Sequence, residues 1–197
     1  MSAVLTPPPQ TFAGRRFRFT REQYYRLGEL GFFDGKRVER IRGEIVEMSP
    51  KNWPHVVASR KAAEVLERAF AGIGWVSRQE PISLPDSDAE PDVAVLPGRF
   101  EDYSDHPTTA LLVVEVSDTT LFDDTTTMAE MYAEAGIAEY WVLDLNGRQL
   151  IVFRDSQPLP TVLGATAYRQ RQTLDPTDRV SPLAAPNASV LVGDLLP

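Results

Sequence analysis

The pattern of apolar and polar residues in the first third of the chain predicts a helix, a hairpin and a second helix. Thr20 and Gln23 form a capping-box pattern at the start of a short helical stretch over 21–30. Apolar and charged residues alternate over 38–48 around a central glycine, which predicts two half-exposed strands joined by a turn. A stripe of apolar residues at helical spacing then predicts a long helix over 54–71.

Strand patterns dominate the rest of the chain. Apolar runs predict strands over 75–84, 91–96 and 110–117, and the third is apolar on both faces except at Glu115, as in a central strand covered on both sides. The remaining predicted elements are a helix over 123–136 capped by Asp123 or Asp124, a hairpin of strands 139–145 and 148–154 around an Asn146-Gly147 turn, and short strands near 161–171 and 188–192. This order predicts an α/β (α+β) fold. Its central mixed β-sheet is flanked by helices, with an N-terminal helix plus hairpin and a C-terminal β extension.

Composition indicates one ordinary globular domain. The chain has 197 residues, 43% of them hydrophobic, and we expect a flexible Pro-rich leader over 1–18 followed by a single domain over 19–197. The start does not resemble a signal peptide and no apolar run approaches the roughly 20 residues that span a bilayer, so we expect a cytoplasmic protein without a membrane partner. Without cysteine and with only two histidines, a metal site would need carboxylates or carbonyls, which favour a hard cation.

Charge is distributed unevenly along the chain. The net charge of -8 argues against a polyanionic partner, because nucleic-acid affinity comes mostly from phosphate neutralisation by Lys and Arg. Up to residue 68, however, basic residues outnumber acidic ones by 13 to 8, whereas beyond it acidic residues outnumber basic ones by 20 to 7. This N-terminal basic region could face a nucleic-acid backbone, or its charges could simply be solvated. The sequence contains no Gly-rich phosphate loop, helix-turn-helix or zinc finger.

Two carboxylates could carry chemistry. Glu115 lies within an apolar strand, and Asp92 follows a proline at the start of another apolar strand. If the two strands are neighbours, the carboxylates can converge, and a divalent cation would offset their repulsion. Mg²⁺, with a backbone carbonyl such as that of Val116, could then support phosphodiester hydrolysis. The alternative is that Glu115 pairs with an arginine or caps a loop, and that Asp92 merely begins a strand.

Four segments together resemble a known family. "RIRGEIVEMSP" with the following helix that carries His55, then "PDVAVLP", "LLVVEVSDTT" and "MAEMYAEAGIAEYWVLDL", are similar to the PD-(D/E)XK nuclease superfamily in its Uma-type restriction endonuclease branch, over roughly 20 to 155. The resemblance implies a restriction-endonuclease-like fold, Mg²⁺ or Mn²⁺ bound by Asp92 and Glu115, and His55 near the active-site edge. It also implies DNA as the substrate and a homodimer.

The lysine of that superfamily is missing from its expected positions. In the superfamily the lysine commonly lies two residues after the glutamate, a position that Ser117 occupies here. In the Uma-type branch it usually lies on the next helix, where this chain has Met128. Methionine can neither deprotonate water nor stabilise phosphate charge. The chain could be a natural pseudo-enzyme, have a metal-only site with reduced activity, have been inactivated by engineering, or take a lysine from the first helix or a partner subunit.

The leading hypothesis is a Mg²⁺-dependent endonuclease-like protein that hydrolyses DNA phosphodiesters, with reduced turnover because of Met128. The alternatives are an inactive nuclease-fold protein acting in nucleic-acid binding or assembly, and a hydrolase of another phosphate ester. His55 is either a capping residue or an outer contact to the cation or phosphate. The weaker candidates have two readings each. Glu44 and Gln79 either line the cavity or face solvent, and Asp118, Thr119 and Thr120 either form a turn or hold the loop beside Glu115 and donate hydrogen bonds to phosphate. Trp75, Tyr140 and Trp141 are either core residues or platforms on which bases stack.

Overall fold

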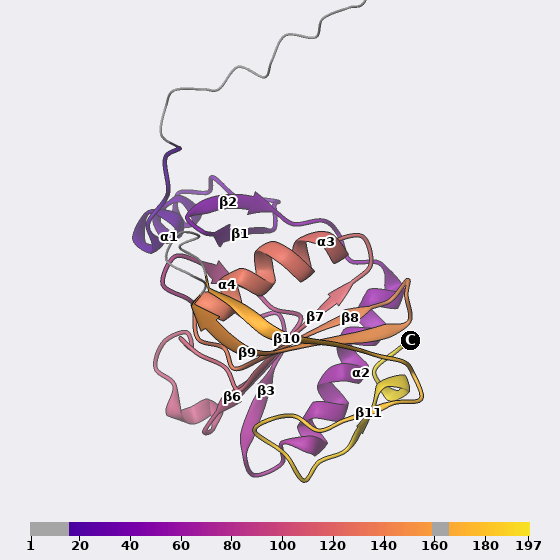
Figure 1. Cartoon of the computed structure of the whole chain (residues 1–197). Helices are drawn as coiled ribbons and strands as arrows, with labels where there is room; N and C mark the ends of the chain where they lie inside the picture. The colour runs from indigo at the N-terminus through magenta and orange to yellow at the C-terminus, as the bar shows by residue number, and fades with distance from the viewer. Residues whose placement is uncertain (1–15, 159–165) are drawn as a thin grey trace, which may run out of the picture.

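The computed structural model describes residues 16–158 and 166–197 (Figure 1). Most of the predicted leader over 1–18, and the first part of the strand predicted near 161–171, lie outside these residues. No helix in the described ranges is both long and apolar enough to cross a membrane.

A six-stranded mixed sheet forms the centre of the molecule. Its strand order is β10-β9-β8-β7-β6-β3. β7 and β8 are parallel, and the other neighbours are antiparallel. The predicted central mixed sheet is therefore confirmed, and its one parallel pair requires a crossover connection between β7 and β8. The strands are β3 (Gly74–Ser77), β6 (Val93–Pro97), β7 (Leu112–Ser117), β8 (Glu139–Asp144), β9 (Gln149–Pro158) and β10 (Thr166–Leu174).

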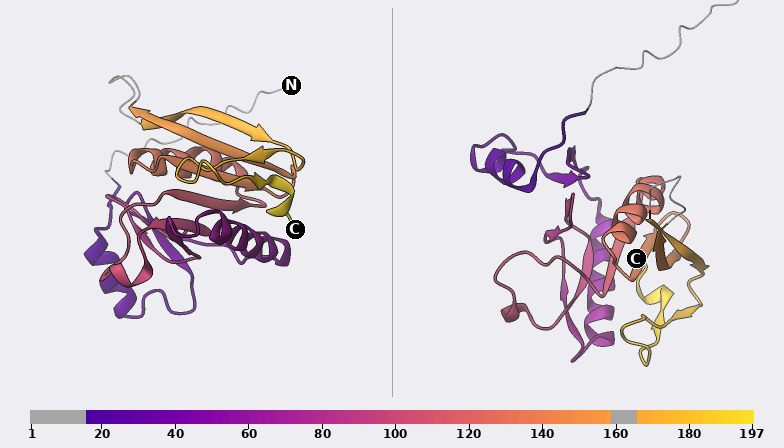
Figure 2. Two further views of the ribbon diagram at one scale, coloured as in Figure 1. Left: turned by 90° about the horizontal axis from the view of Figure 1, so that it is seen from below. Right: turned by 60° about the vertical axis from the view of Figure 1, so that its left-hand side comes forward.

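Helices cover both faces of this sheet. The long helix α2 (Trp53–Ala69) packs on one face, and the crossover segment α3 (Leu121–Asp123), η2 (Asp124–Met128) and α4 (Ala129–Glu134) packs on the other. Figure 1 shows α3 and α4 above the central strands and α2 below them, and Figure 2 gives two further views of the same arrangement. Burial on both faces explains why β7 and β8 are buried along their whole lengths and read as nearly continuous apolar runs.

A smaller sheet joins the N-terminal elements to the central sheet. The predicted first helix and hairpin are confirmed as α1 (Arg21–Glu29), which has the Thr20–Gln23 capping box, and β1 (Val38–Ile41) with β2 (Glu44–Glu47). β1 also pairs with β5 (Asp88–Ala89), which pairs with β4 (Ile82–Ser83).

The strand predicted over 75–84 is wrong as a single element. It divides into β3 of the central sheet and β4 of the small sheet. Gln79 adopts a φ of 56°, which an extended strand cannot accommodate, and Pro81 follows it. The chain therefore turns out of one sheet and into the other, which the alternating pattern alone did not show.

The hairpin of β8 and β9 is confirmed, but its turn differs from the predicted two-residue Asn-Gly turn. Asp144 pairs with Gln149, so four residues form the loop, and the left-handed residue is Arg148, at φ 49°. Gly147 donates its N–H to Asp144 Oδ1 at 2.9 Å, and a Cβ at Gly147 would collide with the Asp144 carboxylate. A glycine is thus required at position 147, because the backbone passes too close to the Asp144 side chain to leave room for a Cβ.

The helix predicted over 123–136 begins earlier and is irregular. Helical structure starts at Leu121 and passes through the π-helical turn η2 before α4, so neither Asp123 nor Asp124 is its N-cap. Asp124 is instead buried and accepts a hydrogen bond from Thr120 Oγ1 at 2.6 Å. The π turn places this carboxylate inward, as π turns often do at functional sites.

The C-terminal residues complete the layer on the α2 face. β11 (Arg179–Val180) pairs with β12 (Val190–Leu191), which confirms the short strand predicted near 188–192. Apolar side chains after Leu174 join the core cluster that contains α2. The remaining short helices are η1 (Phe100–Asp102) and η3 (Val192–Asp194).

Candidate active site

Asp92 and Glu115 meet where β6 and β7 run side by side. Val93 pairs with Val114 in antiparallel register, so Asp92, one residue before β6, lies opposite Glu115. The Asp92 N–H donates to Glu115 Oε2 at 3.2 Å, and the Val116 N–H donates to Asp92 Oδ2 at 2.9 Å. Backbone hydrogen bonds of neighbouring strands therefore fix both carboxylates at one point of the sheet.

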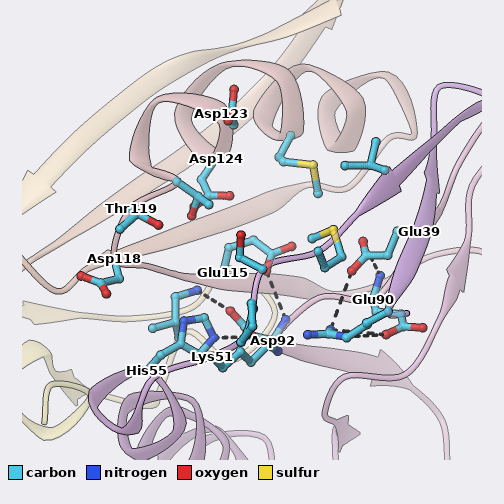
Figure 3. A pocket seen from close by; sticks show the side chains of 18 of the residues that line it. Glu39, Lys51, His55, Glu90, Asp92, Glu115, Asp118, Thr119, Asp123 and Asp124 are labelled. Carbon is cyan, nitrogen blue, oxygen red and sulfur yellow. Dashed lines mark hydrogen bonds and ion pairs between the residues drawn. The ribbon is translucent and has the colours of Figure 1, made fainter. Parts of the chain in front are cut away.

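Two nitrogen groups approach Asp92 from the start of α2. Lys51 Nζ lies 2.6 Å and His55 Nε2 lies 2.9 Å from the same oxygen, Asp92 Oδ1 (Figure 3). His55 is in the first turn of α2, where its N–H donates to the side-chain cap Asn52 at 3.0 Å. Because an ionised carboxylate only accepts, His55 Nε2 carries the proton in this contact.

The two carboxylates have opposite electrostatic environments. Burial alone would raise the pKa of Asp92, but the hydrogen bond and charge of His55, together with Lys51, outweigh it and lower the pKa. Burial, followed by the charge of Asp92, raises the pKa of Glu115 well above its usual value, although Tyr132 donates to Glu115 Oε1 at 2.8 Å. Within the described residues no Lys, Arg or His forms an ion pair with Glu115, so the alternative arginine partner is absent there.

Two further buried carboxylates lie near this pair. Burial raises the pKa of Glu39, on β1, to about 7, and burial raises the pKa of Asp124 to about 6. Both side chains face the same cavity as Asp92 and Glu115. The site thus concentrates negative charge that the protein neutralises only in part.

The cavity has a volume of about 480 Å³ and is bounded by three parts of the fold: β1–β2, the loop and helix of 48–55, and the segment of 115–128. Eight of its lining residues are Asp or Glu, against the three basic residues Arg37, Lys51 and His55. Arg37 is itself paired with Glu90 at 3.3 Å. A phosphate entering this cavity would need added positive charge.

The other sequence candidates divide into two groups. Five of them line the cavity: Val116, Asp118, Thr119, Thr120 and Met128. Met128 is also partly buried against the core cluster on that face of the sheet. The candidates that lie elsewhere are Glu44, which pairs with Arg16, the exposed Gln79, and Trp75, Tyr140 and Trp141, which pack in the core or its margin.

Sequence reasoning missed Lys51, Glu39, Asp124 and Tyr132 as site residues. Lys51 lies four residues before His55, and that spacing was the available signal. Asp124 and Tyr132 both belong to the predicted crossover helix, but the π turn that moves Asp124 inward has no clear sequence pattern. Glu39 is buried next to the equally buried Arg40, in a strand that the sequence pattern predicted to be half exposed.

The N-terminal basic region is largely neutralised by the protein itself. In the structure, Arg40 pairs with buried Asp88 at 2.8 Å, and Arg42 pairs with Glu134 at 3.1 Å. The other pairs in this region are Arg16–Glu44, Arg21–Asp105, Lys36–Glu47 and Arg37–Glu90. Many of the charges that appeared free in sequence therefore have partners.

The donor set fits a hard divalent cation that retains water. Among the residues placed in the structure, no three His, Asp or Glu side chains form a cluster able to hold a metal by themselves. Mg²⁺, however, is commonly bound by one or two carboxylates plus waters and substrate oxygens. The buried Glu115 carboxylate, which forms no ion pair with any described residue, lies opposite Asp92 and supplies this arrangement.

The fold and site define a mixed α/β protein with a buried carboxylate pair at the edge of an acidic cavity. Residues 21–192 match the Uma2 family, described as "Putative restriction endonuclease", and the chain belongs to that family. The fold is shared with a solved "putative nuclease belonging to DUF820" from Anabaena variabilis ATCC 29413, at a TM-score of 0.66, 16% identity, and coverage of 88% of this chain and 95% of that one. The predicted family and fold class are thus confirmed.

A second solved structure, the type IIG restriction endonuclease BpuSI, matches with a TM-score of 0.38 and 18% identity, over 64% of this chain and 15% of that one. No curated protein is a significant match to the chain.

The raised pKa values predict that the metal-free protein loses stability as pH rises. A carboxyl group whose folded pKa exceeds its unfolded pKa stabilises the fold below the unfolded value and loses that contribution as pH rises through the folded value. For Glu39 and Asp124 this window runs from about pH 4 to about pH 7. Each group should contribute a loss of up to about 3 kcal/mol in the free energy of unfolding.

Urea unfolding at pH 5 and pH 7.5, with and without Mg²⁺, measures this effect. Mg²⁺ should restore stability at pH 7.5 and have little effect at pH 5, where the carboxyl groups retain protons. Glu39→Gln, which removes one of these groups, should flatten the pH dependence. Stability that increases from pH 5 to pH 7.5 without metal would contradict the electrostatic description of the site.

Proposed function

We propose that this protein is a Mg²⁺- or Mn²⁺-dependent endonuclease that hydrolyses phosphodiester bonds of DNA. The observation that carries the proposal is the Glu115 carboxylate, buried opposite Asp92 without a cationic partner in the described structure. A lone buried carboxylate is costly, and a cation shared with Asp92 would compensate it. Membership of the Uma2 family supports the same chemistry.

The chain's own residues have distinct roles in this proposal. Asp92 and Glu115 would hold the cation, together with the Val116 carbonyl, and a cation there would polarise the phosphoryl oxygen and activate water. Tyr132 fixes the orientation of Glu115 through its 2.8 Å hydrogen bond, and His55 fixes Asp92 through its contact at 2.9 Å. These contacts keep the carboxylates in place before substrate arrives.

DNA is proposed as the substrate on the strength of family membership. The cavity is acidic, so DNA binding should depend on the divalent cation, with exposed N-terminal basic residues contacting the backbone further away. A homodimer and a cytoplasmic location remain predictions from the sequence resemblance and composition.

Met128 favours a second candidate function. If no other group replaces the expected lysine, the protein would keep its fold and cation site and act in nucleic-acid binding or assembly without cleavage. Hydrolysis of another phosphate ester is a third candidate, consistent with the chain's overall negative charge.

Nicking of supercoiled plasmid DNA tests the proposal. We expect nicked and linear products with Mg²⁺ or Mn²⁺ and none with a chelator, because the carboxylate pair acts only with a cation. Asp92→Asn should abolish cleavage. Asp175→Asn, an equal charge change at an exposed turn, should leave it intact.

Absence of cleavage with either cation, together with cation-dependent retardation of DNA in gels, would instead support the binding function. Hydrolysis of small phosphodiesters without plasmid cleavage would support the third candidate.

A further inference from the structure

Lys51 is the lysine whose ammonium group reaches the carboxylate pair. Its Nζ lies 2.6 Å from Asp92 Oδ1, and its side chain is 17% exposed. The two other lysines of the chain are engaged elsewhere: Lys36 pairs with exposed Glu47, and Lys61 donates to the Leu196 carbonyl. Lys51 therefore brings into the site the chemical group that sequence reasoning could not locate.

The backbone around Lys51 is anchored on both sides. Before it, the Met48 N–H donates to the Arg37 carbonyl at 2.8 Å. After it, Asn52 caps α2, and its side-chain amide donates to the Asp118 carboxylate. The position of the Lys51 backbone is thus fixed, while its flexible four-carbon side chain can redirect the ammonium within the cavity.

Lys51 and Met128 line the same cavity from different elements. Met128 lies at the end of the π turn, and its thioether carries no N–H to offer a phosphate. Ser117, at the other position where a lysine is expected, contributes only a hydroxyl 3.5 Å from Thr120 Oγ1. Neither expected position therefore supplies an ammonium group, whereas Lys51 places one beside Asp92.

The charge balance of the cavity gives this ammonium a role beyond neutralising Asp92. Arg37 is held by Glu90, and His55 contacts Asp92, so Lys51 is the flexible lining cation closest to the carboxylate pair. A divalent cation bound between Asp92 and Glu115 would compete for Asp92 Oδ1 and repel the ammonium from it. A phosphate oxygen is then the favourable new partner for Lys51.

We propose that Lys51 is the catalytic lysine of this chain, an inference that rests on the proposed function. Its ammonium moves from Asp92 to a non-bridging oxygen of the bound phosphodiester and stabilises the charge that develops there. The water oxygen forms the new P–O bond as the ester P–O bond breaks. The proton lost by water passes to solvent, the leaving oxygen takes a proton from solvent, and the ammonium keeps its own protons throughout.

Four proteins test the proposal in the plasmid assay: wild type, Lys51→Met, Met128→Lys and the double variant. Lys51→Met should lower the cleavage rate by about 100-fold, the usual effect of removing one donor from a developing oxyanion. In the double variant, Met128→Lys should restore most of the rate that Lys51→Met loses, because the side chain at position 128 lines the same cavity. Thermal melts check that each variant folds.

Each other result of this assay overturns the inference. Lys51→Met with wild-type rates would show that the ammonium does not act in the reaction. Loss of cleavage without rescue would show that Lys51 only holds Asp92 in place. Cleavage by Met128→Lys but not by the wild type would show that the lysine function is truly missing.

Binding of short duplex DNA in the presence of Ca²⁺ tests Lys51 independently of cleavage. Lys51→Met should weaken binding about tenfold, the value of one charge-assisted hydrogen bond, and the double variant should recover it. Arg169→Met, which removes one positive charge from an exposed position on β10, should bind like the wild type. If none of the four proteins cleaves plasmid DNA, the proposed function fails. Unchanged binding by Lys51→Met would overturn the role of Lys51.

Discussion

Glu115→Gln should lower metal-dependent DNA cleavage by about 10³-fold or more, because it removes a charge that holds the cation while preserving side-chain volume. The amide oxygen can still accept from Tyr132, which donates to Glu115 Oε1 in the structure. The loss should therefore come from chemistry rather than unfolding. Initial rates of plasmid nicking at saturating Mn²⁺ measure it.

The matched control is Glu67→Gln, the same change on an exposed face of α2, which should cleave like the wild type. Calorimetric titration should show that Glu115→Gln also binds Mn²⁺ more weakly. Cleavage by Glu115→Gln at the wild-type rate would place the reactive site elsewhere in the protein.

Glu139→Ala should destabilise the fold by about 3–5 kcal/mol, the cost of breaking a buried charged network. Glu139 is fully buried at the start of β8 and accepts from Arg154 Nε at 2.8 Å, Trp141 Nε1 at 2.9 Å and the Leu183 N–H at 2.7 Å. Its removal leaves a guanidinium and two N–H groups without their acceptor. It also removes the hydrogen bond that links the Leu183 N–H of the C-terminal extension to the central sheet.

Urea unfolding of the variant and the wild type at pH 7.5 measures this loss. Glu130→Ala, in which a half-exposed carboxylate loses a 3.4 Å contact to Arg42, should cost about 1 kcal/mol or less. Equal stability losses for Glu139→Ala and Glu130→Ala would contradict the importance assigned to the buried network.

The fold was largely predictable because burial on two faces leaves a clear pattern. β7 and β8 read as apolar runs, and the helical stripes of α2 and α4 match the core clusters they form. Local backbone conformation was less predictable. The left-handed Gln79 divides a predicted strand, and the π turn at 124–128 shifts a predicted helix start, because both depend on tertiary contacts that periodicity does not report.

The site was predictable where strand register determines it. Asp92 and Glu115 could be paired from two apolar strands, since neighbours in an antiparallel sheet bring opposite positions together. Lys51 could not be found this way, because it lies on a loop whose path is fixed by the Asn52 cap and the Met48 backbone contact. The ammonium group beside Asp92 therefore comes from a segment that precedes both carboxylates in the chain, not from the residues after Glu115.

Diffraction from crystals soaked in Mn²⁺ tests the central claim most directly, because the anomalous signal locates the cation. We expect a peak between Asp92 and Glu115, within coordination distance of an oxygen of each carboxylate, with Lys51 Nζ displaced from Asp92 Oδ1. A saturated crystal without density between these carboxylates would contradict the assignment of the site.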